Sequence, residues 1–543
     1  MIIGFESWTD NGQVYIRNTA GDFISSSNAG ELINFLRYKG SGMKMAFDLD
    51  QFLAPIFRLM PKDTLERLSR FDSDLKYPNN AKPSDPTELF YLSGRMFRAG
   101  RSHFYGLREW LDRSERNCKW TLEEATERAE EIYTTLHRIG MKRPDNQMVR
   151  KLTSPIAVFE DSEWGMQFRS TIPTNWDLPK DVLDITTFAS KADKREWVSA
   201  HQIGMFNKGE IFDYDRSSAY GLEASLLPDT RDLTYWTSSK LGSREMSATL
   251  GFIHGKFTLN PEHPFSFASP IMRKREGQDL PSLPLGRLPP DYYTLDEVRH
   301  VLDNGLGKFR LIDGWFGEPK SGVDVRYPFQ DIMQRLHSMR DISPIAKRIC
   351  KSLAVQIVGK MIETRATGEK GNMWNDILHS TVVARNRIAV SQFLISNRVA
   401  EDQIVTIQTD GVKLTVDLPC RQEGLGSWVN KGSDDTLIIS PFKVYTRSNR
   451  PSEFDLSDLR RLVAEHPMAQ RYSKTNIHRI TLIQAIRNYE DITRTGELIE
   501  APTSLDLMTL DVEQNRIFSK LPNSGKQLLD NKNKYRSKPI VLE

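Results

Sequence analysis

Apolar and polar residues recur along the first third of the chain in patterns that predict a mixed α/β domain. The segments IIGFES and KMAFDLD contain the short apolar runs of strands or strand ends. The segment TLEEATERAEEIYTTLHRIG has the apolar spacing of an amphipathic helix, with Thr121 near its start. The polar segment TIPTNWDLPKD then breaks the pattern and predicts a boundary before the next block.

The middle of the chain contains a predicted strand, an insert, a helical region and a hairpin. Residues 210–221 begin as the apolar strand EIFDYD and end in small polar residues. Residues 222–330 are rich in Pro and Gly, as in PSLPLGRLPPDYY, which predicts an irregular insert. Residues 328–361 are predicted to be helical, with a loop around Asp341 to Pro344. In VTIQTDGVKLTV, apolar and polar residues alternate on both sides of Asp-Gly, a strong β-hairpin signal. The chain beyond residue 450 is predicted to be mostly helical.

Length and charge limit the possible architectures. A chain of 543 residues is too long for one hydrophobic core, so two to four domains are expected. The formal net charge is only +3, so nucleic-acid contact would need a local concentration of Lys and Arg. The C-terminal segment from Lys520 to Lys538 offers such a concentration. A solvated tail explains that segment equally well.

Cysteine usage and hydropathy indicate a reducing compartment. Cys118, Cys350 and Cys420 lie far apart and form neither a CxxC pair nor a plausible zinc site. No apolar stretch approaches 18 residues, and the N-terminus carries no secretory signal pattern. We therefore expect a soluble monomer without membrane contact in the cytoplasm of a bacterium or host cell, with a mitochondrial origin as the alternative.

Two acidic sites are candidates for metal binding. Asp215 lies at the end of the strand in GEIFDYDRSSAYG, and Asp410 lies at the tip of the hairpin in TIQTDGVKL. Carboxylates brought together on adjacent strands can hold two Mg²⁺ ions, which activate a 3′-hydroxyl and stabilise a leaving pyrophosphate. Each site alone is weak evidence, because an Asp-Gly hairpin is usually only a turn. Asp213 competes with Asp215, but the spacing to Ser218 and Tyr220 favours Asp215.

Cations accompany the two acidic sites. In ISPIAKRICKSLAVQIVGKM, Lys347 and Lys351 lie one helical turn apart and share a face, and Arg340 lies just upstream. Three such cations suit the phosphates of a nucleotide, although a solvated basic face is the simpler explanation. In PFKVYTRS, Lys443 and Tyr445 alternate on a predicted strand and point the same way.

Taken in order, these four segments resemble the polymerase motifs of family B DNA polymerases. DRSSAYG resembles DxxSLYP, KSLAVQIVG resembles KxxxNSxYG, QTDG resembles YxDTDS or DTDG, and KVY matches KxY. HQIGMF, from His201 to Phe206, is similar to the YxGG element before the first motif. The layout is most similar to the small protein-primed polymerases of phages and linear plasmids.

The resemblance implies a fold and a catalytic site. The fold would be a right-hand polymerase of palm, fingers and thumb, preceded by a DnaQ/RNase H-like exonuclease-type domain. Asp215 and Asp410 would be the catalytic metal ligands for two Mg²⁺ ions, for which Mn²⁺ can substitute. Ser218 would contact the triphosphate. Tyr220 would stack under the sugar and exclude a 2′-hydroxyl.

The resemblance also gives roles to the cations and to the last motif. Arg340, Lys347 and Lys351 would hold the phosphates of the incoming nucleotide. Lys443 and Tyr445 would touch the primer strand. The substrates and partners implied are template-primer DNA, dNTPs and a terminal protein that serves as primer.

Several positions depart from the family pattern. Gln408 stands where the first Asp of DTD lies, which is the less essential of the two. Val355 and Val358 replace the Asn and Tyr that pack on the nascent base pair, and Gly221 replaces a Pro. The segment after Gly359 is shorter than the second insert of protein-primed relatives, which supports strand displacement.

The N-terminal third resembles a DnaQ-like 3′–5′ exonuclease domain whose motifs have changed. The DxE motif is Gly4-Phe5-Glu6, and NxxFD has become KxxFD, with Lys44 and Asp48 at its ends. The third motif, YxxxD, has two possible counterparts, Trp120 with Glu124 and Tyr133 with His137. Glu6, Asp48 and Glu124 would be an exonuclease remnant with the activity lost. Ordinary strand-end acids explain Glu6 and Asp48 equally well.

These interpretations predict a domain order and a function. The predicted domains are 1–185 exonuclease-like, 186–260 first palm part, 261–330 first insert, 331–372 fingers, 373–450 second palm part and 451–543 thumb and C-terminal region. The predicted function is a DNA-directed DNA polymerase that replicates a phage, virus or mobile-element genome, adding dNMP to a primer 3′-hydroxyl or a terminal-protein hydroxyl. The alternatives are a polymerase-derived nucleic-acid-binding scaffold with impaired catalysis, and a metal-dependent nuclease.

Overall fold

The computed structural model describes most of the chain, which forms two compact units. The described residues are 2–38, 43–69, 75–77, 87–92, 95–100, 102–111, 113–116, 118–143, 152–273, 281–364, 368–420, 424–440, 443–446, 456–487, 492–506 and 516–542. The first unit joins Met1–Phe168, Met339–Ile349 and Thr475–Ala501. The second unit joins Arg169–Ser338, Cys350–Lys474 and Pro502–Glu543. The six domain boundaries of the sequence analysis stay predictions.

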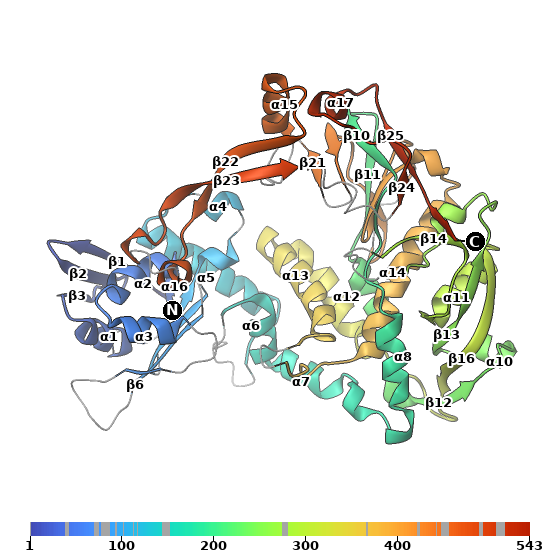
Figure 1. The fold of residues 1–543 in the computed structure, drawn as a ribbon. Helices are drawn as coiled ribbons and strands as arrows, with labels where there is room; N and C mark the ends of the chain where they lie inside the picture. Colours follow the sequence, from blue (N-terminus) through green and yellow to red (C-terminus); the bar gives the residue numbers. More distant parts are fainter. Residues whose placement is uncertain are drawn as a thin grey trace. The chain divides into compact units, whose positions relative to one another are not determined.

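The first unit is built on an eight-stranded mixed sheet in the order β3-β2-β1-β4-β8-β7-β6-β5 (Figure 1). Its strands are β1 Ile2–Asp10, β2 Gln13–Asn18, β3 Phe23–Ser26, β4 Met43–Ala46, β5 Leu75–Tyr77, β6 Thr87–Leu92, β7 Met96–Ala99 and β8 Ser102–Gly106. β1 pairs in parallel with β4, and β4 pairs in parallel with β8. The predicted strands IIGFES and KMAFDLD are β1 and β4, the first two members of this parallel trio.

Helices accompany the sheet of the first unit. They are α1 Ala29–Tyr38, α2 Leu49–Phe57, α3 Lys62–Leu68, α4 Arg113–Arg116, α5 Leu122–Arg138, α6 Pro155–Asp161, α7 Glu163–Thr171, which ends in the second unit, and α16 Leu482–Arg487. The predicted amphipathic helix is α5, and Thr121 caps it in a capping box with Glu124. Apolar residues of α1, α2 and α16, among them Leu32, Phe52 and Leu482, share one buried cluster with Phe5 and Phe104 of the sheet.

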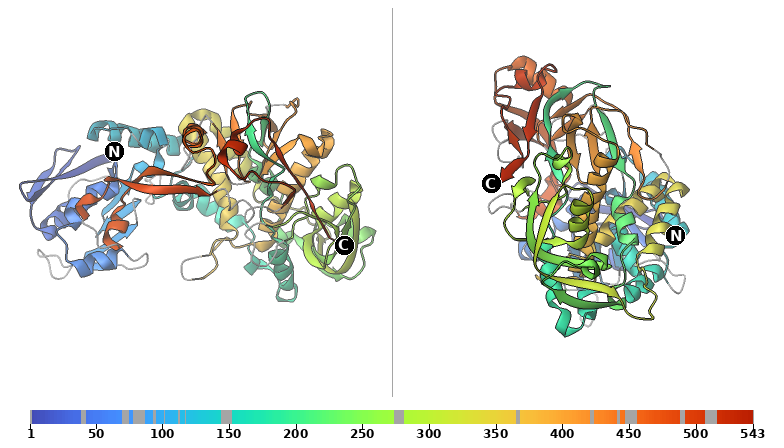
Figure 2. Two further views of the ribbon diagram at one scale, coloured as in Figure 1. Left: turned by 45° about the horizontal axis from the view of Figure 1, so that its top comes forward. Right: turned by 90° about the vertical axis from the view of Figure 1, so that its right-hand side faces the viewer.

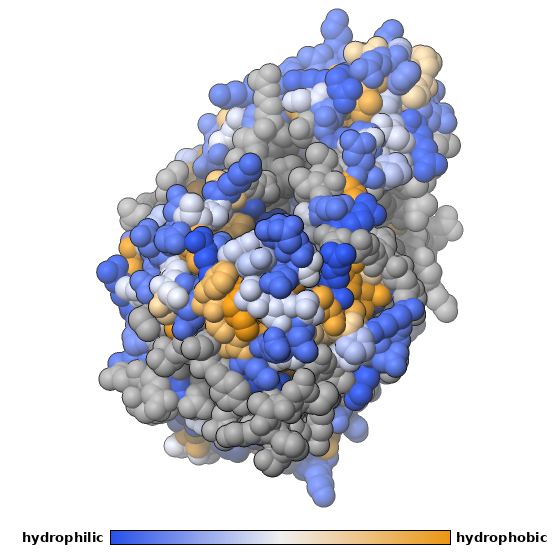
Figure 3. All heavy atoms as spheres, turned by 90° about the vertical axis from the view of Figure 1, so that its left-hand side faces the viewer, coloured by the Kyte–Doolittle hydropathy of each residue, from blue (hydrophilic) through white to orange (hydrophobic). Residues whose placement is uncertain are grey.

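One face of the three-stranded end of this sheet carries exposed aromatic rings. Trp8 is 39% exposed and Phe23 is 58% exposed. Trp8 stacks on Tyr15 with ring centroids 5.4 Å apart. Viewed from the side that carries β1–β3, hydrophobic residues lie in patches separated by hydrophilic ones (Figure 3).

The second unit contains the predicted hairpin in a five-stranded antiparallel sheet, in the order β19-β11-β18-β17-β9. These strands are β9 Val198–Ala200, β11 Phe212–Arg216, β17 Ile404–Gln408, β18 Gly411–Leu414 and β19 Trp428–Asn430. Helix α14 (Asp376–Ser396) packs on the sheet, and its Phe393 stacks on Trp428 at 4.0 Å (Figure 1). The hairpin VTIQTDGVKLTV and the strand EIFDYD are therefore confirmed as β17–β18 and β11.

The described residues within 222–330 form strands and helices, so the predicted irregular insert is wrong. Their strands are β12 Leu233–Ser238, β13 Leu250–Leu259, β14 Pro284–Arg287, β15 Asp291–Thr294 and β16 Gly307–Pro319, with helices α10 Ser243–Ser247 and α11 Leu295–Asp303. The sheet order is β12-β16-β13-β14-β26, with β15 on β13. Several of the glycines that suggested irregular structure, such as Gly251, lie inside strands where other side chains pack closely. A Cβ at Gly251 would lie 3.0 Å from the Leu295 Cβ.

The described residues beyond 450 form five strands and three α-helices, so the predicted mostly helical region is also wrong. Its elements are α15 Leu456–Glu465, β22 Arg471–Arg479, α16, β23 Leu498–Asp506, β24 Ile517–Phe518, α17 Gly525–Leu529, β25 Tyr535–Lys538 and β26 Ile540–Leu542. β22 and β23 pair as a two-stranded ribbon, which Figure 1 and the left view of Figure 2 show. Both strands pass from one unit to the other.

The basic segment from Lys520 to Lys538 is folded, which rules out the solvated tail. β25 pairs with β10 (Gln202–Phe206), and β24 pairs with β25. The same sheet continues through β20 (Thr436–Ile438) to β21 (Val444–Thr446). Lys534 lies over the Phe206 ring at 4.2 Å and donates to the Met205 carbonyl.

The predicted helical region 328–361 is confirmed. It consists of α12 Gln330–Ser338 and α13 Pro344–Lys360, joined by a 3-10 turn at Met339–Ile342 in place of the predicted loop. α12 belongs to the second unit, and α13 begins in the first unit and ends in the second. No helix in the part of the chain that the structure describes is long and apolar enough to cross a membrane.

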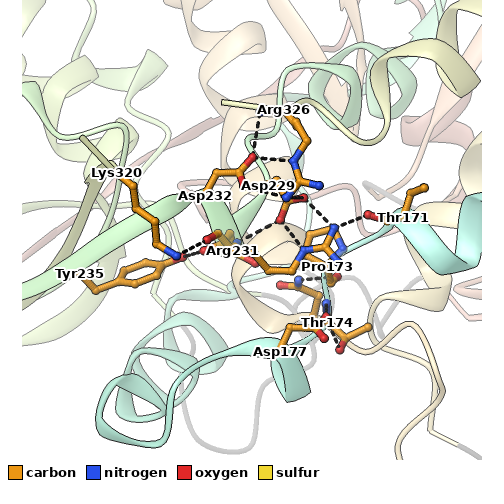
Figure 4. Close-up of polar contacts among 12 residues, drawn as sticks. Thr171, Pro173, Thr174, Asp177, Asp229, Arg231, Asp232, Tyr235, Lys320 and Arg326 are labelled. Atoms are coloured by element: carbon orange, nitrogen blue, oxygen red, sulfur yellow. Dashed lines mark hydrogen bonds and ion pairs between the residues drawn. The ribbon is translucent and has the colours of Figure 1, made fainter. Parts of the chain in front are cut away.

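A network of ion pairs fixes the start of the second unit to the β12–β16 sheet (Figure 4). Asp229 is 1% exposed and pairs with Arg231 at 2.7 Å and with Arg326 at 3.1 Å. Arg326 also pairs with Asp232, and Arg231 donates to the Thr171 carbonyl. These contacts connect α7 to the segments that flank β12 and follow β16.

Asp229→Ala is expected to lower the free energy of unfolding of the second unit by about 2–4 kcal/mol, since it leaves Arg231 without its buried partner and removes one of the two carboxylates that pair with Arg326. Chemical denaturation with a probe in this unit measures the effect. The matched control is Glu318→Ala. Glu318 pairs with Arg244 and is more exposed than Asp229, so this variant should change stability by less than about 1 kcal/mol. Equal effects of the two variants would contradict the structural role of Asp229.

Candidate active site

The two candidate metal ligands meet at one end of the β11–β18–β17 sheet. Asp215 of β11 is the cross-strand neighbour of Gly411 in β18. Asp410 lies in the two-residue turn between Gln408 and Gly411, where Thr409 adopts a positive φ of 61°. The Arg216 amide donates to the Asp410 carbonyl over 3.0 Å. Residues far apart in the sequence are therefore joined by strand pairing.

A side chain on residue 411 would crowd this end of the sheet. A Cβ at Gly411 would lie 3.2 Å from the Tyr214 carbonyl and 3.4 Å from Asp215 Oδ1. The Gly of the Asp-Gly turn thus leaves space beside the Asp215 carboxylate. The sequence pattern explained this Gly only as a turn residue.

The electrostatics of the pair resemble those of an acidic metal site. Burial raises the pKa of the Asp410 carboxyl to about 6, and the charge of Asp215 adds to the increase. Lys351 and Lys431 oppose the increase, so both ammonium groups act on Asp410. A carboxylate whose proton affinity is raised by a neighbouring carboxylate is stabilised when a cation binds beside it.

Asp213, the competing aspartate on β11, is engaged elsewhere. Its carboxylate pairs with Lys413 of β18 at 2.5 Å. Its backbone carbonyl accepts from the Lys431 amide at 2.7 Å, and its amide donates to the Gly432 carbonyl at 3.0 Å. Asp213 therefore holds strands together, and Asp215 is the aspartate that faces Asp410.

The residues after Asp215 form a short turn and helix beside the acidic pair. Ser218 adopts the left-handed conformation (φ 53°, ψ 43°) before α9 (Ala219–Ser225). The Ser218 Oγ is buried and has no hydrogen-bond partner among the residues that the structure describes. Such a hydroxyl gains a partner when a polar ligand atom approaches it.

Tyr220 is held by a residue that the motif pattern did not identify. Its hydroxyl donates to Glu196 Oε1 over 3.0 Å. Burial, followed by the charge of Glu196, raises the pKa of Tyr220 far above its ordinary value, and the charge of Asp410 also contributes. The ring is therefore fixed in its neutral form close to the acidic pair. Glu196 adjoins Trp197, whose carbonyl accepts from the Thr409 amide at 2.7 Å, a contact that only tertiary structure reveals.

The predicted basic face of α13 exists. Lys347, Lys351 and Val355 lie at intervals of four residues on an exposed face, and Val355 is 50% exposed. Val358 lies in the core with 2% exposure. Lys351 belongs to the unit that carries Asp215 and Asp410, whereas Arg340 and Lys347 belong to the first unit.

Lys443 and Tyr445 differ in burial, and their common direction on one strand stays a prediction. Lys443 directly precedes β21, its amide donates to the Ser440 carbonyl, and its carbonyl accepts from the Ile439 amide. Tyr445 pairs with Leu437 of β20 and is only 7% exposed. Its ring packs in the core of this sheet.

A lysine that the sequence patterns did not identify lies on the acidic pair. Lys431 follows β19 and places its Nζ 2.8 Å from Asp215 Oδ2. β19 has only three residues, so no hydrophobic alternation marks it in the sequence. The neighbouring strand β11 gives Lys431 its position, because Asp215 pairs with Val429 two residues earlier.

Asp215 and Asp410 have the donor chemistry for Mg²⁺. Mg²⁺ in nucleotide-processing sites is held by one or two carboxylates together with phosphate oxygens and water. Among the described residues, no group of three or more His, Cys, Asp or Glu side chains could hold a metal ion alone. The pair therefore fits a metal that arrives with a phosphate ligand better than a permanent structural ion.

Two of the candidate exonuclease residues, Glu6 and Asp48, pair with cations of the described residues. Glu6 forms an ion pair with Arg17 of the neighbouring strand β2. Asp48 caps α2 by accepting from the Gln51 amide, and it also forms ion pairs with Arg108 and Arg479. Both acids already have cationic partners.

The remaining exonuclease candidates also make contacts within the first unit. Glu124 closes the capping box of α5 and is exposed. Trp120 donates to the Glu115 carbonyl, and the Tyr133 and His137 rings lie 5.3 Å apart on α5. Lys44 lies on the opposite sheet face from Gly4, since it pairs with Ile3, and its Nζ donates to the Leu36 carbonyl at 2.8 Å.

Position 4 has no space for the acid that the DxE motif requires. A Cβ on Gly4 would overlap the Thr126 Oγ1 of α5 and lie 3.0 Å from Leu122 Cδ1. The helix therefore packs directly on the strand where a carboxylate would have to project. The substitution to glycine and the close packing of α5 belong together.

Comparison with known proteins places this geometry in context. No family model and no curated protein sequence matches the chain. Among solved structures, Phi29 DNA polymerase in an orthorhombic crystal form matches with a TM-score of 0.57 and 12% identity, over 93% of this chain and 99% of that chain. Phi29 DNA polymerase complexed with primer-template DNA and incoming nucleotide substrates matches with the same values.

The chain shares the fold of Phi29 DNA polymerase. The predicted fold class, a mixed α/β right-hand polymerase preceded by an exonuclease-type domain, is therefore confirmed. A further match, to Phi29 DNA polymerase complexed with single-stranded DNA, has a TM-score of 0.52 and 11% identity over 93% of this chain. At this identity the likeness establishes the fold and not the chemistry.

Because the proton affinity of Asp410 is raised, its contribution to the free energy of unfolding of the metal-free protein should fall as the pH rises. The pKa is about 6 in the folded state and 3.8 in the unfolded reference, so folding favours the protonated form. The stabilisation is complete below about pH 4 and is lost as the pH rises through about 6. Asp410→Asn should therefore be more stable than the wild type by about 1–3 kcal/mol at pH 7.5, and the two should converge near pH 4.

Urea denaturation in EDTA at several pH values measures this difference. Asp213→Asn is the control, because Asp213 is paired with Lys413. A wild type that is as stable as Asp410→Asn at pH 7.5 would contradict the free-energy cost assigned to the ionised Asp410 carboxylate.

Proposed function

We propose that the protein is a DNA-directed DNA polymerase that extends a 3′-hydroxyl with dNTPs. The observation that carries the proposal is the convergence of Asp215 and Asp410 on paired strands, within a fold shared with a DNA polymerase. Template-primer DNA and dNTPs are the proposed substrates. Primer extension on a singly primed template tests the proposal directly.

Asp215 and Asp410 would hold two Mg²⁺ ions, which Mn²⁺ can replace. Bound there, the ions would lower the pKa of the attacking hydroxyl and neutralise charge on the triphosphate. The protein's own contribution is position, because phosphoryl transfer needs alignment and charge rather than covalent catalysis. The sheet supplies that alignment, since strand pairing fixes both carboxylates relative to each other.

Neighbouring residues would position the nucleotide. The buried Ser218 hydroxyl would donate to a triphosphate oxygen, and the Lys351 ammonium would balance phosphate charge. Tyr220, fixed by Glu196, would support the sugar and leave no space for a 2′-hydroxyl. Arg340 and Lys347 are proposed to extend the phosphate contacts, and Lys443 is proposed to contact the primer strand. Tyr445 would support that strand's position from the core.

We also propose that the N-terminal domain has lost proofreading. Its acids cap a helix or pair with arginines, and Gly4 leaves no carboxylate at the first motif. We further propose that the sheet that contains β12 to β16 is a docking domain for a terminal protein during initiation. Such a partner would supply the first hydroxyl.

A polymerase-derived scaffold without catalysis is the second candidate. The observation that favours it is the Lys431 ammonium on Asp215, together with Val355 and Gln408 at positions that differ from the family motifs. A metal-dependent nuclease is less well supported, since it explains neither the fixed Tyr220 nor Lys351. Nucleotide incorporation separates the polymerase from both alternatives.

Tyr220→Val is expected to raise ribonucleotide incorporation relative to deoxyribonucleotide incorporation by about 10-fold or more, because it removes the ring that limits the sugar. Single-nucleotide insertion kinetics with matched dNTP and rNTP measures the ratio. Tyr235→Phe, which removes only the hydroxyl of a tyrosine outside this site, is the control. An unchanged ratio in Tyr220→Val would eliminate the proposed role.

A further inference from the structure

The backbone that carries Lys431 is anchored on both sides. The Lys431 amide donates to the Asp213 carbonyl at 2.7 Å, and the Gly432 carbonyl accepts from the Asp213 amide at 3.0 Å. Asn430 adds a side-chain bond to Asp417 at 2.9 Å and accepts from the Gly432 amide at 2.8 Å. Lys431 therefore has a fixed Cα next to β11.

The side chain extends from this anchor to the acidic pair. Lys431 Nζ lies 2.8 Å from Asp215 Oδ2, and its charge also lowers the proton affinity of Asp410. The Lys431 side chain is 49% exposed, whereas Asp215 is 26% exposed. The ammonium therefore reaches the carboxylates from the solvent side on a flexible stem that can move away.

A divalent cation on Asp215 would compete with this ammonium. Mg²⁺ and Mn²⁺ bind carboxylate oxygens at about 2.0–2.2 Å, so a cation on Asp215 Oδ2 would lie within a few ångströms of Nζ. Like charges at that distance repel strongly in a partly desolvated site. Either the lysine leaves or the metal binds weakly.

We propose that Lys431 is a resident counter-ion that a divalent metal must displace from Asp215. The inference rests on the proposed metal site. In the metal-free protein the ammonium satisfies Asp215 and lowers the affinity of the pair for metal. A triphosphate would give the displaced ammonium a new anionic partner, so metal and nucleotide would bind together.

The test measures Mn²⁺ binding by electron paramagnetic resonance of the free ion, with no DNA or nucleotide present. Lys431→Met should bind Mn²⁺ about 3–30-fold more tightly than the wild type, because one competing charge is removed. Lys431→Arg should stay close to the wild type. Lys413→Met is the matched control, since Lys413 pairs with Asp213, which lies on the same strand as Asp215. This variant should leave Mn²⁺ affinity unchanged.

Asp215→Asn distinguishes the possible failures. If Asp215→Asn abolishes Mn²⁺ binding, but the wild type and Lys431→Met bind Mn²⁺ with equal affinity, the counter-ion role is overturned and the metal site remains. Mn²⁺ binding that is unaffected by Asp215→Asn in either background would overturn the metal site and the inference with it. A thermal-shift assay adds a second readout. Lys431→Met should have a lower Tm than the wild type in EDTA and a larger increase in Tm on adding Mn²⁺.

Discussion

Asp215→Asn and Asp410→Asn are each expected to reduce nucleotide addition by at least about 10³-fold, because each removes a ligand from ions that supply several kcal/mol to the transition state. Affinity for primer-template DNA should change by less than about threefold, since neither carboxylate makes an attractive contact with a phosphate backbone. Asparagine preserves the size of the side chain and removes its charge. Rapid-quench primer extension and a fluorescence binding assay measure the two quantities.

Asp213→Asn provides the internal control for these variants. It changes the same type of side chain on the same strand, but its carboxylate pairs with Lys413 instead of facing Asp410. Its extension rate should stay within about fivefold of the wild type. If Asp213→Asn were inactive and Asp215→Asn active, the assignment of the two aspartates would have to be reversed.

The second large effect is the absence of proofreading. A primer with a mismatched 3′ terminus should remain intact in Mg²⁺ or Mn²⁺ without dNTP, because two-metal hydrolysis needs several converging acids. Glu6 pairs with Arg17, Asp48 pairs with Arg108 and Arg479, and Gly4 provides no side-chain oxygen. Prompt release of the terminal nucleotide, abolished by Asp48→Ala, would show that the domain retains a functional exonuclease site.

Restoring the missing acid should not restore the activity. Gly4→Asp would place a Cβ on the Thr126 Oγ1 and should lower the free energy of unfolding of the first unit by about 2 kcal/mol or more. The double variant Gly4→Asp, Thr126→Gly relieves that overlap and tests chemistry apart from stability. Exonuclease activity in the double variant would mean that Glu6 and Asp48 are still available to metal.

The sequence predicted the elements that rest on strong local patterns. The Asp-Gly hairpin, the strand before Asp215 and the capped helix after Thr121 all occur where alternation, helical spacing or capping chemistry predicts them. Each of these signals depends on neighbours in the chain. The two candidate metal ligands were found for the same reason, because each lies inside a recognisable local motif.

What the sequence could not supply depends on pairing between distant segments. The glycine-rich region 222–330 seemed irregular because the side chains that fill the space beside its glycines, such as Leu295 beside Gly251, come from other elements. Lys431 reaches the site because β19 pairs with β11, and Glu196 reaches it through its hydrogen bond with the buried Tyr220. No periodic pattern in the sequence encodes either contact. Tyr445 lies in the core because β21 pairs with β20.

Primer extension on a singly primed DNA template, with Mg²⁺, labelled dNTPs and the Asp215→Asn, Asp410→Asn double variant in parallel, tests the central claim most directly. We predict template-dependent extension by the wild type, no extension by the double variant, and equal binding of the primed template by both. A wild type that binds the primed template but adds no nucleotide with Mg²⁺ or Mn²⁺ would contradict the claim and favour the scaffold.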